Sequence, residues 1–320
     1  MNTCGQPNEK NPVGIVERYG LELNSIIGKD AKVEVIASGF EWVEGPVWIE
    51  SQKMLLVSDV PKNQIYKWTA AKGKELYLES SGYTGTSSRG GESGSNGLML
   101  NEKNQLVLCQ HGDRRVALMN SPVDLPEPNF TTLINNYRGK KFNSPNDLAL
   151  KSNGDIYFTD PPYGLEKNMD DPLKELNFQG VYRISKNGTV TLLTDTITRP
   201  NGIAIFPGEE TVLVANSDPQ KPHWYAFDLN KEGNFVNGRI FLDGTKIFKK
   251  DNRVPDGLKI DNKGNVFATG PGGVWIFDRE GKALGRIKLN VTTSNCAFAN
   301  NFKTLFITAD HHLLKIELRK

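Results

Sequence analysis

The hydrophobic positions of this chain fall in short runs, and a polar residue stands directly before many of them. In one example, Asn146 precedes an apolar run, a turn follows at Gly154, and a second apolar run ends in Asp160. Runs rich in Val, Ile, Phe, Tyr and Trp, bounded by Gly, Asn, Asp and Pro, predict β-strands. Helical periodicity is weak, and only residues 13–27 are expected to form a short helix.

This pattern recurs in six units, each with two further apolar runs after the first. The residues that open the units are spaced by 52, 50, 55, 55 and 39 positions, and they are Glu44, Asn96, Asn146, Asn201, Asp256 and Asn295. A period near 50 with three or four short strands is typical of a β-propeller blade. We therefore expect an all-β fold, a six-bladed β-propeller with four-stranded blades.

The last unit ends at Lys320 without room for its own outer strand, and the apolar segment 32–37 can supply one. An N-terminal strand in the last blade would close the ring and cover an edge that is otherwise unpaired. The expected organisation is therefore a single propeller domain over residues 31–320. A tail over residues 1–30, which includes the short helix, precedes it.

Two insertions interrupt the repeat. Residues 80–95 are too rich in Gly and Ser for a strand, and residues 161–179 separate two strands of the third unit. Long ordered loops on a rigid scaffold often cover a binding site. For residues 80–95, a flexible linker is the alternative.

Composition excludes some classes of partner. The chain has 39 Lys and Arg against 37 Asp and Glu, and no basic stripe that would favour nucleic acid. No apolar run is long enough to span a membrane. Cys4, Cys109 and Cys296 match no zinc spacing. Because a polar tether follows Cys4, we expect a periplasmic or lipid-anchored protein that has lost its signal, with a cytoplasmic protein as the alternative. Protein partners and oligomeric state are not readable from the sequence.

If the ring closes, the six opening residues bring carboxylate and amide oxygens to one axis. This set contains no His or Cys, and it suits a hard cation. We expect Ca²⁺, with Mg²⁺, Mn²⁺ or Zn²⁺ as substitutes. Turn formation explains one or two such residues but not a glutamate in the same position as five others.

Candidate chemistry follows from the metal. A bound Ca²⁺ can polarise a carbonyl or phosphoryl oxygen, and a carboxylate beside it can act as general base. Asp256, in a Pro-Asp-Gly turn, is the candidate catalytic residue because its side chain is shorter than that of Glu44. His111 and Arg114 follow a second strand and are candidate contacts of the substrate or of the residues that surround the metal.

Several motifs resemble the gluconolactonase/regucalcin (senescence marker protein) family, and most closely its bacterial gluconolactonase branch. They cover residues 35–318 and include Glu44-Gly-Pro-Val-Trp, Asn143-Ser-Pro-Asn-Asp-Leu, Phe158-Thr-Asp-Pro-Pro-Tyr-Gly, Pro200-Asn-Gly-Ile-Ala and Pro255-Asp-Gly-Leu. The resemblance implies a six-bladed propeller with Ca²⁺ at the channel mouth. The implied metal ligands are Glu44, Asn146, Asn201 and Asp256, with Asp256 catalytic and with Asn96 and Asn295 lining the site.

The chain departs from related phosphatases that hold a second calcium, because Lys259 and Ala297 replace an acid and a His. A calcium-dependent hydrolase that opens sugar lactones is therefore the expected function. Two alternatives stay open: a non-enzymatic ligand-binding propeller, and an esterase or phosphotriesterase with the same metal.

Overall fold

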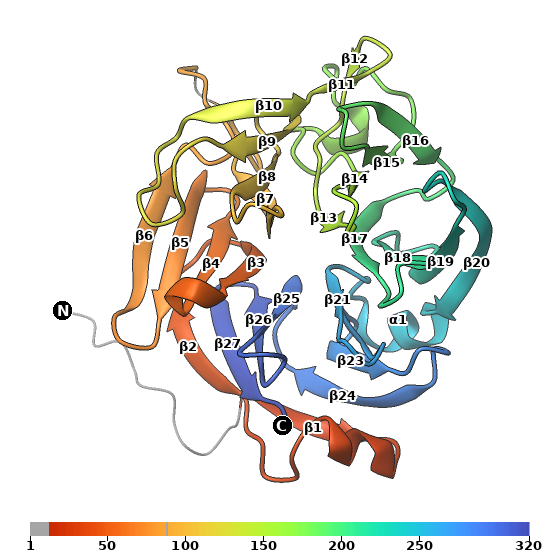
Figure 1. The fold of residues 1–320 in the computed structure, drawn as a ribbon. Coiled ribbons are helices and arrows are strands. Elements are labelled where there is room, and N and C mark those ends of the chain that lie inside the picture. The colour runs from red at the N-terminus through yellow and green to blue at the C-terminus, as the bar shows by residue number, and fades with distance from the viewer. Residues whose placement is uncertain (1–12, 88, 320) are drawn as a thin grey trace.

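A computed structural model describes residues 13–87 and 89–319. Within these ranges, six antiparallel sheets are arranged as blades around a central axis (Figure 1). In the first four blades the chain runs outward from the inner strand, and in the last two an N-terminal strand is added at the outer edge. This arrangement confirms the predicted six-bladed propeller. The expectation of a lipid anchor at Cys4 lies outside the described residues.

The strands have these bounds. The first blade contains β3 (Val43–Ile49), β4 (Met54–Asp59), β5 (Gln64–Thr69) and β6 (Gly73–Glu79). The second contains β7 (Ser95–Leu100), β8 (Leu106–Gln110), β9 (Arg115–Met119) and β10 (Phe130–Ile134). The third contains β13 (Leu148–Leu150), β14 (Ile156–Asp160), β15 (Gly180–Ile184) and β16 (Val190–Thr194). The fourth contains β17 (Pro200–Ile205), β18 (Thr211–Asn216), β19 (His223–Leu229) and β20 (Phe235–Asp243).

The fifth blade contains β21 (Leu258–Ile260), β22 (Val266–Gly270), β23 (Gly273–Phe277), β24 (Ala283–Leu289) and, at its outer edge, β1 (Gly14–Arg18). The sixth contains β25 (Asn295–Ala299), β26 (Thr304–Ala309), β27 (His312–Glu317) and β2 (Glu34–Ser38). A small hairpin of β11 (Asn136–Tyr137) and β12 (Lys140–Lys141) lies outside the blades. The helical elements are α1 (Thr245–Asp251) and 3₁₀ helices at Leu21–Ser25, Glu50–Gln52 and Asn168–Asp170.

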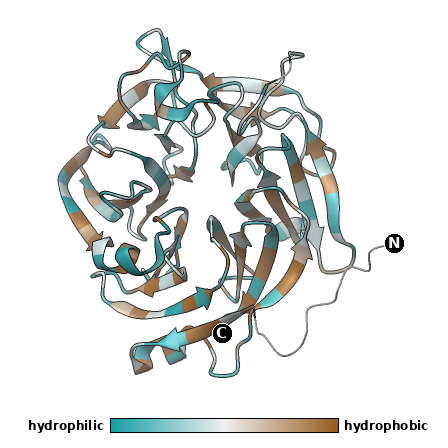
Figure 2. Cartoon of the chain, turned by 180° about the vertical axis from the view of Figure 1, so that it is seen from behind, coloured by the Kyte–Doolittle hydropathy of each residue, from teal (hydrophilic) through white to brown (hydrophobic). Residues whose placement is uncertain are grey.

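The second strands are among the most deeply buried elements. Every residue of β4, β14, β22 and β26 is buried, because neighbouring blades cover both faces of these strands. Figure 2 shows hydrophobic residues gathered in the blades and hydrophilic residues in many of the connecting loops. Aromatic rings join adjacent blades, as where Trp48 of the first blade stacks on Phe306 of the sixth at 5.5 Å. The continuous apolar runs of the sequence are thus the strands buried on both faces.

The ring closes as predicted. Strand β2 pairs antiparallel with β27, so the N-terminal strand completes the last blade. The two ends of the propeller are therefore held together by main-chain hydrogen bonds, and the edge of β27 is covered.

The short helix expected over residues 13–27 is mostly wrong. Residues 14–18 form β1, which pairs with β24, and only Leu21–Ser25 is helical, as a 3₁₀ turn. The free edge of β24 accepts this segment, and Gly14 permits the close approach, since a Cβ there would lie 2.5 Å from Leu289. Leu23 is fully buried against the fifth and sixth blades, so part of the expected tail belongs to the propeller.

No helix in the described ranges is both long and apolar enough to cross a bilayer.

Candidate active site

Five of the six residues that open the units line one cavity of about 430 Å³ at the start of the inner strands, and they are Glu44, Asn96, Asn146, Asn201 and Asp256. Figure 1 shows the inner strands β3, β7, β13, β17, β21 and β25 around the common axis. The repeat therefore does bring oxygen-bearing side chains from five blades to one place.

β-Bulges turn several of these residues toward the axis. The pairing of inner and second strands shifts by one residue between Glu44 and Val47, and again between Pro200 and Ile203. A bulge inserts an extra residue and re-aims its side chain. Asn201 lies within the second shift and Glu44 directly before the first, so bulges adjoin polar side chains that face the cavity.

Hydroxyl groups of the second strands fix the neighbouring blade. Ser58 donates to the Asn96 carbonyl at 2.9 Å, and Thr159 donates to the Asn201 carbonyl at 2.7 Å. Each hydroxyl lies one residue before the end of its strand. The acid that follows in each of these strands accepts hydrogen bonds from the segment just before the opening residue of its own blade. Asp160, for example, accepts from the Ser144 amide at 2.8 Å. This explains the acid that ends the second apolar run in the sequence.

Gly45 lies at a close approach between the first two blades. Its φ is +55°, and a Cβ would lie 1.9 Å from the Asn96 carbonyl oxygen. We expect Gly45→Ala to destabilise the protein by about 3 kcal/mol or more, because backbone strain and steric overlap add. Urea unfolding measures this loss.

Gly73 offers a matched control, since its φ is +69° and a Cβ added there would meet nothing within 4 Å. Gly73→Ala is expected to cost about 1 kcal/mol from backbone strain alone. Equal losses in the two variants would contradict the close approach of the first two blades.

The amide side chains form a directed chain across the cavity. Asn96 Nδ2 donates to Asn146 Oδ1 at 3.0 Å, and Asn146 Nδ2 donates to Asn201 Oδ1 at 2.7 Å. Asn201 in turn donates to the Ser217 hydroxyl at 2.9 Å. The chain fixes the amide orientations: the Oδ1 atoms of Asn146 and Asn201 each accept from a neighbouring amide, and Asn96 Oδ1 is left without a partner among the described residues.

Among the described residues, neither Glu44 nor Asp256 forms an ion pair, whereas Glu92 lies 3.4 Å from His111 Nδ1. Burial and the nearby Asp147 and Glu92 raise the pKa of Glu44 to about 8. Burial, together with Glu44 and Glu92, raises the pKa of Asp256 well above its usual range. Like charges held together out of water disfavour ionisation, and a cation between them would reverse this effect.

The donor set fits a hard divalent cation. The Oδ1 atoms of Asp256 and Asn96 are buried without a hydrogen-bond partner among the described residues. No group of three or more His, Cys, Asp or Glu gathers as a metal site in the described ranges. Two carboxylates with three amide oxygens instead match Ca²⁺, which accepts six to eight oxygen ligands, some of them water.

Asn295 does not line the cavity, although its side chain lies beside that of Glu44, which does. Its backbone N–H bonds the Thr308 hydroxyl at 2.9 Å and its Oδ1 accepts from the next amide, as the equivalent atoms of Asp147 do. Ser294, whose N–H bonds the Thr308 carbonyl, therefore takes the opening position of this blade. A shift of one residue turns the side chain to the other face. The alignment of Asn295 with the other five residues is therefore wrong by one position.

Asn295 lies beside an ion pair between Lys259, which is partly exposed, and Asp147, which is buried. The ammonium of Lys259 is 3.6 Å from the Asp147 carboxylate and 3.3 Å from Asn295 Oδ1. The ammonium of Lys259 thus lies beside Asp147, one of the acids that act on Glu44.

His111 and Arg114 have different surroundings. His111 is fully buried, and its Nε2 lies 3.2 Å from Asn146 Oδ1, so it supports a candidate ligand. Arg114 is outside the cavity and donates to the carbonyls of Phe142 at 2.6 Å and Leu173 at 2.9 Å. The expectation that Arg114 contacts substrate is not supported by this placement, since its guanidinium anchors the 161–179 loop.

The two insertions bring side chains to the cavity that the sequence reasoning missed. Glu92 of the 80–95 loop lines it and lies 3.4 Å from His111 Nδ1, and Tyr163 of the 161–179 loop lines it too. Arg89 donates to the carbonyls of Gly112 and Gly164, which ties the first loop to the second. The 80–95 loop is therefore a packed covering segment, and its sequence position before Asn96 was the available signal.

Arg199, Ser217 and Arg253 also line the cavity without having been singled out. Arg199 lies two residues before Asn201, and Ser217 directly follows the second strand of the same blade. The signal for Arg199 was its position close to an opening residue, and the signal for Ser217 was its position at the end of a second strand.

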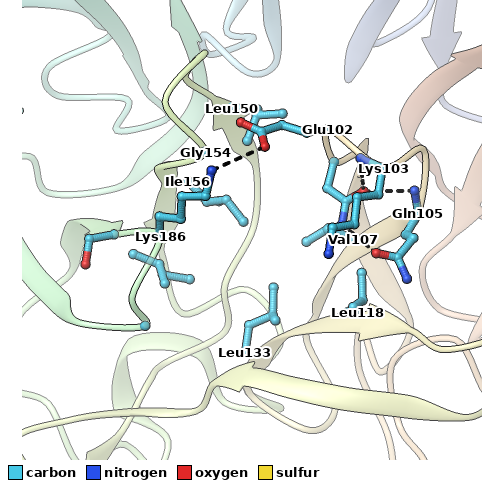
Figure 3. A pocket seen from close by; sticks show the side chains of 14 residues that line it. Glu102, Lys103, Gln105, Val107, Leu118, Leu133, Leu150, Gly154, Ile156 and Lys186 are labelled. Atoms are coloured by element: carbon cyan, nitrogen blue, oxygen red, sulfur yellow. Dashed lines mark hydrogen bonds and ion pairs between the residues drawn. The ribbon is translucent and has the colours of Figure 1, made fainter.

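A second cavity of about 370 Å³ lies between the second and third blades, where their inner strands end (Figure 3). It is lined by apolar side chains such as Val107 and Leu133, with Glu102, Lys103 and Lys186 around them. It lacks the converging carboxylates and amides of the first cavity, which therefore remains the candidate active site.

Comparisons with known proteins agree with this geometry. Residues 42–311 match the family described as SMP-30/Gluconolactonase/LRE-like region. A gluconolactonase of Zymomonas mobilis is 36% identical, with 96% of this chain and 87% of that protein covered. Regucalcin of Gallus gallus is 24% identical, with 87% and 86% covered.

A solved gluconolactonase structure from Xanthomonas campestris superposes with a TM-score of 0.82 at 28% identity and covers 99% of both chains. A calcium-binding regucalcin from Agrobacterium tumefaciens superposes with a TM-score of 0.69 at 16% identity, covers 89% of this chain and 94% of that one, and supports the fold alone. With a family match over most of its length, this chain belongs to the SMP-30/gluconolactonase/LRE-like family.

Proposed function

We propose that this protein is a calcium-dependent hydrolase that opens sugar lactones. The observation that carries the proposal is the meeting of Glu44 and Asp256 with three asparagine amides in one cavity. The names of the relatives from Zymomonas mobilis and Xanthomonas campestris, both gluconolactonases, support the substrate class.

The residues that would hold the ion are Glu44, Asn146, Asn201 and Asp256. When bound, Ca²⁺ supplies Lewis acidity that polarises the lactone carbonyl. Asn96 and His111 both contact Asn146 and keep its amide oriented. Such supporting contacts are as important for a metal site as the ligands themselves.

Asp256 is the proposed general base. Its Oδ1 has no hydrogen-bond partner in the described chain, so it is free to accept the proton of the attacking water. The water oxygen bonds to the carbonyl carbon, the ring C–O bond then breaks, and Asp256 returns the proton to the departing ring oxygen. The product is the open hydroxy acid.

Tyr163 is a proposed donor to the substrate. Burial raises its pKa above the usual range of a phenol, so the hydroxyl stays protonated. It can therefore donate a hydrogen bond to a lactone oxygen at neutral pH.

A substrate panel tests the proposed function. Acid release at constant pH, corrected for spontaneous hydrolysis, is measured with D-glucono-δ-lactone, an aryl ester and a phosphotriester. We expect kcat/KM to be highest for the lactone. Faster turnover of the ester or phosphotriester would assign the site to that chemistry, and no turnover with retained Ca²⁺ binding would indicate a ligand-binding propeller.

A further inference from the structure

Arg199 is held firmly at the wall of the cavity. Its backbone N–H donates to Asn216 Oδ1 at 2.8 Å, and its carbonyl accepts from the Ser217 N–H at 3.0 Å. It is two residues from Asn201, a candidate metal ligand, and it lines the same cavity as Asp256. The side chain therefore starts from a fixed point next to the proposed reaction centre.

The guanidinium of Arg199 has no hydrogen bond or ion pair within the described chain, although the residue is partly buried. Arg253, the other arginine of the cavity, is different: its Nε lies 3.3 Å from Asp251 Oδ1, and its Nη1 donates to the Leu289 carbonyl at 3.4 Å. Arg89 and Arg114 donate to main-chain carbonyls of the 161–179 loop, at Gly164 and Leu173 respectively. The donors of Arg199 are thus the ones left for a ligand.

In the described part of the chain, no acid of the cavity forms an ion pair with the positively charged guanidinium of Arg199. Glu92 lies beside His111, and Glu44 accepts from the Gly45 amide at 2.9 Å. No carboxylate oxygen of the described residues lies within 4.0 Å of the Arg199 guanidinium, whereas Arg253 has such a neighbour in Asp251. A guanidinium presents five donors in a planar fork that matches a carboxylate or a phosphate.

We propose that Arg199 binds an anionic group of the substrate, so that the cavity prefers sugar lactones that carry a phosphate or carboxylate away from the ring carbonyl. This inference rests on the proposed lactonase function and names its substrate class. The cavity of about 430 Å³ is within the usual size of small-molecule sites, so it has room for such a substituent.

Binding tests the inference without any turnover. Calorimetry compares D-glucitol 6-phosphate with D-glucitol, which differ only in the phosphate and cannot be hydrolysed as lactones. We expect the phosphate ester to bind the wild type at least about 10-fold more tightly, because a hydrogen bond between charged groups is about twice as strong as one between neutral groups. Arg199→Gln is expected to remove this preference, and Arg199→Lys to restore part of it.

Turnover then identifies the anion. The ratio of kcat/KM for an anionic lactone to that for D-glucono-δ-lactone is measured with 6-phospho-D-glucono-δ-lactone and with D-glucaro-1,4-lactone. We expect the higher ratio to exceed about 10 and to fall at least 10-fold in Arg199→Gln. Arg279→Gln is the matched control, because Arg279 is outside the cavity and contacts Pro207 and Phe206.

Equal binding of D-glucitol and its phosphate by the wild type, or the same preference in Arg199→Gln, would overturn the inference. These results concern Arg199 alone. Failure of the lactonase function would instead appear as an absence of turnover with every lactone, while the binding comparison would still decide the role of Arg199.

Discussion

Replacing Asp256 by asparagine is expected to lower kcat for lactone hydrolysis by about 100- to 10,000-fold at saturating Ca²⁺, the range usual for loss of a general base. Asparagine keeps the shape of the side chain and one oxygen, but it cannot accept the proton of the attacking water. Steady-state kinetics with a six-membered sugar lactone measure the loss of kcat, and calorimetry measures whether Ca²⁺ still binds.

Asp195 provides the control for this variant. It is exposed and does not line the cavity, so Asp195→Asn makes the same charge change without touching the site. If Asp256→Asn bound Ca²⁺ and turned over lactone as the wild type does, the assignment of Asp256 as base would be wrong.

Glu44→Gln is expected to have the second-largest effect, and of a different kind. The substitution removes one of two carboxylates from the donor set, and Ca²⁺ affinity depends on the charge of its ligands. We expect the Kd for Ca²⁺ to rise at least about 10-fold, and lactone hydrolysis to recover when Ca²⁺ is raised above the new Kd. Activity measured against Ca²⁺ concentration shows this shift.

Comparing Asp256→Asn with Glu44→Gln distinguishes a residue that takes part in the reaction from one that only binds the ion. Excess Ca²⁺ should restore Glu44→Gln but leave Asp256→Asn slow. Glu232→Gln, at an exposed position, should behave as wild type. An unchanged Ca²⁺ dependence in Glu44→Gln would remove Glu44 from the candidate ligands.

The fold was predictable because the same strand pattern recurs along the chain. A polar residue before a short strand means little once, but six copies near one period constrain the ring, and the missing outer strand of the last unit indicated the closure by β2. Five of the six opening residues do line one cavity.

Asn295 shows the limit of this reasoning. The alternation of a strand does not reveal where a bulge inserts an extra residue, and the inner strand of the sixth blade pairs without the shift seen at Glu44. A single position then separated Ser294, in the opening position, from Asn295, which faces the channel below.

The rest of the site comes from irregular segments. Glu92 and Tyr163 reach the cavity only because the two covering loops pack on each other, and no periodic pattern reports such packing. The prediction of a helix over residues 13–27 was wrong for a related reason. Strand β1 forms because β24 offers a free edge, and this tertiary effect overrides local preference.

The most direct test of the central claim is lactone hydrolysis by the wild type after removal of bound metal with a chelator, followed by stepwise addition of Ca²⁺. We expect no enzymatic hydrolysis after chelation and a saturable return of activity, with Ca²⁺ bound at the cavity of Glu44, Asn146, Asn201 and Asp256. Full activity of the metal-free protein, with no response to added Ca²⁺, would contradict the calcium-dependent lactonase.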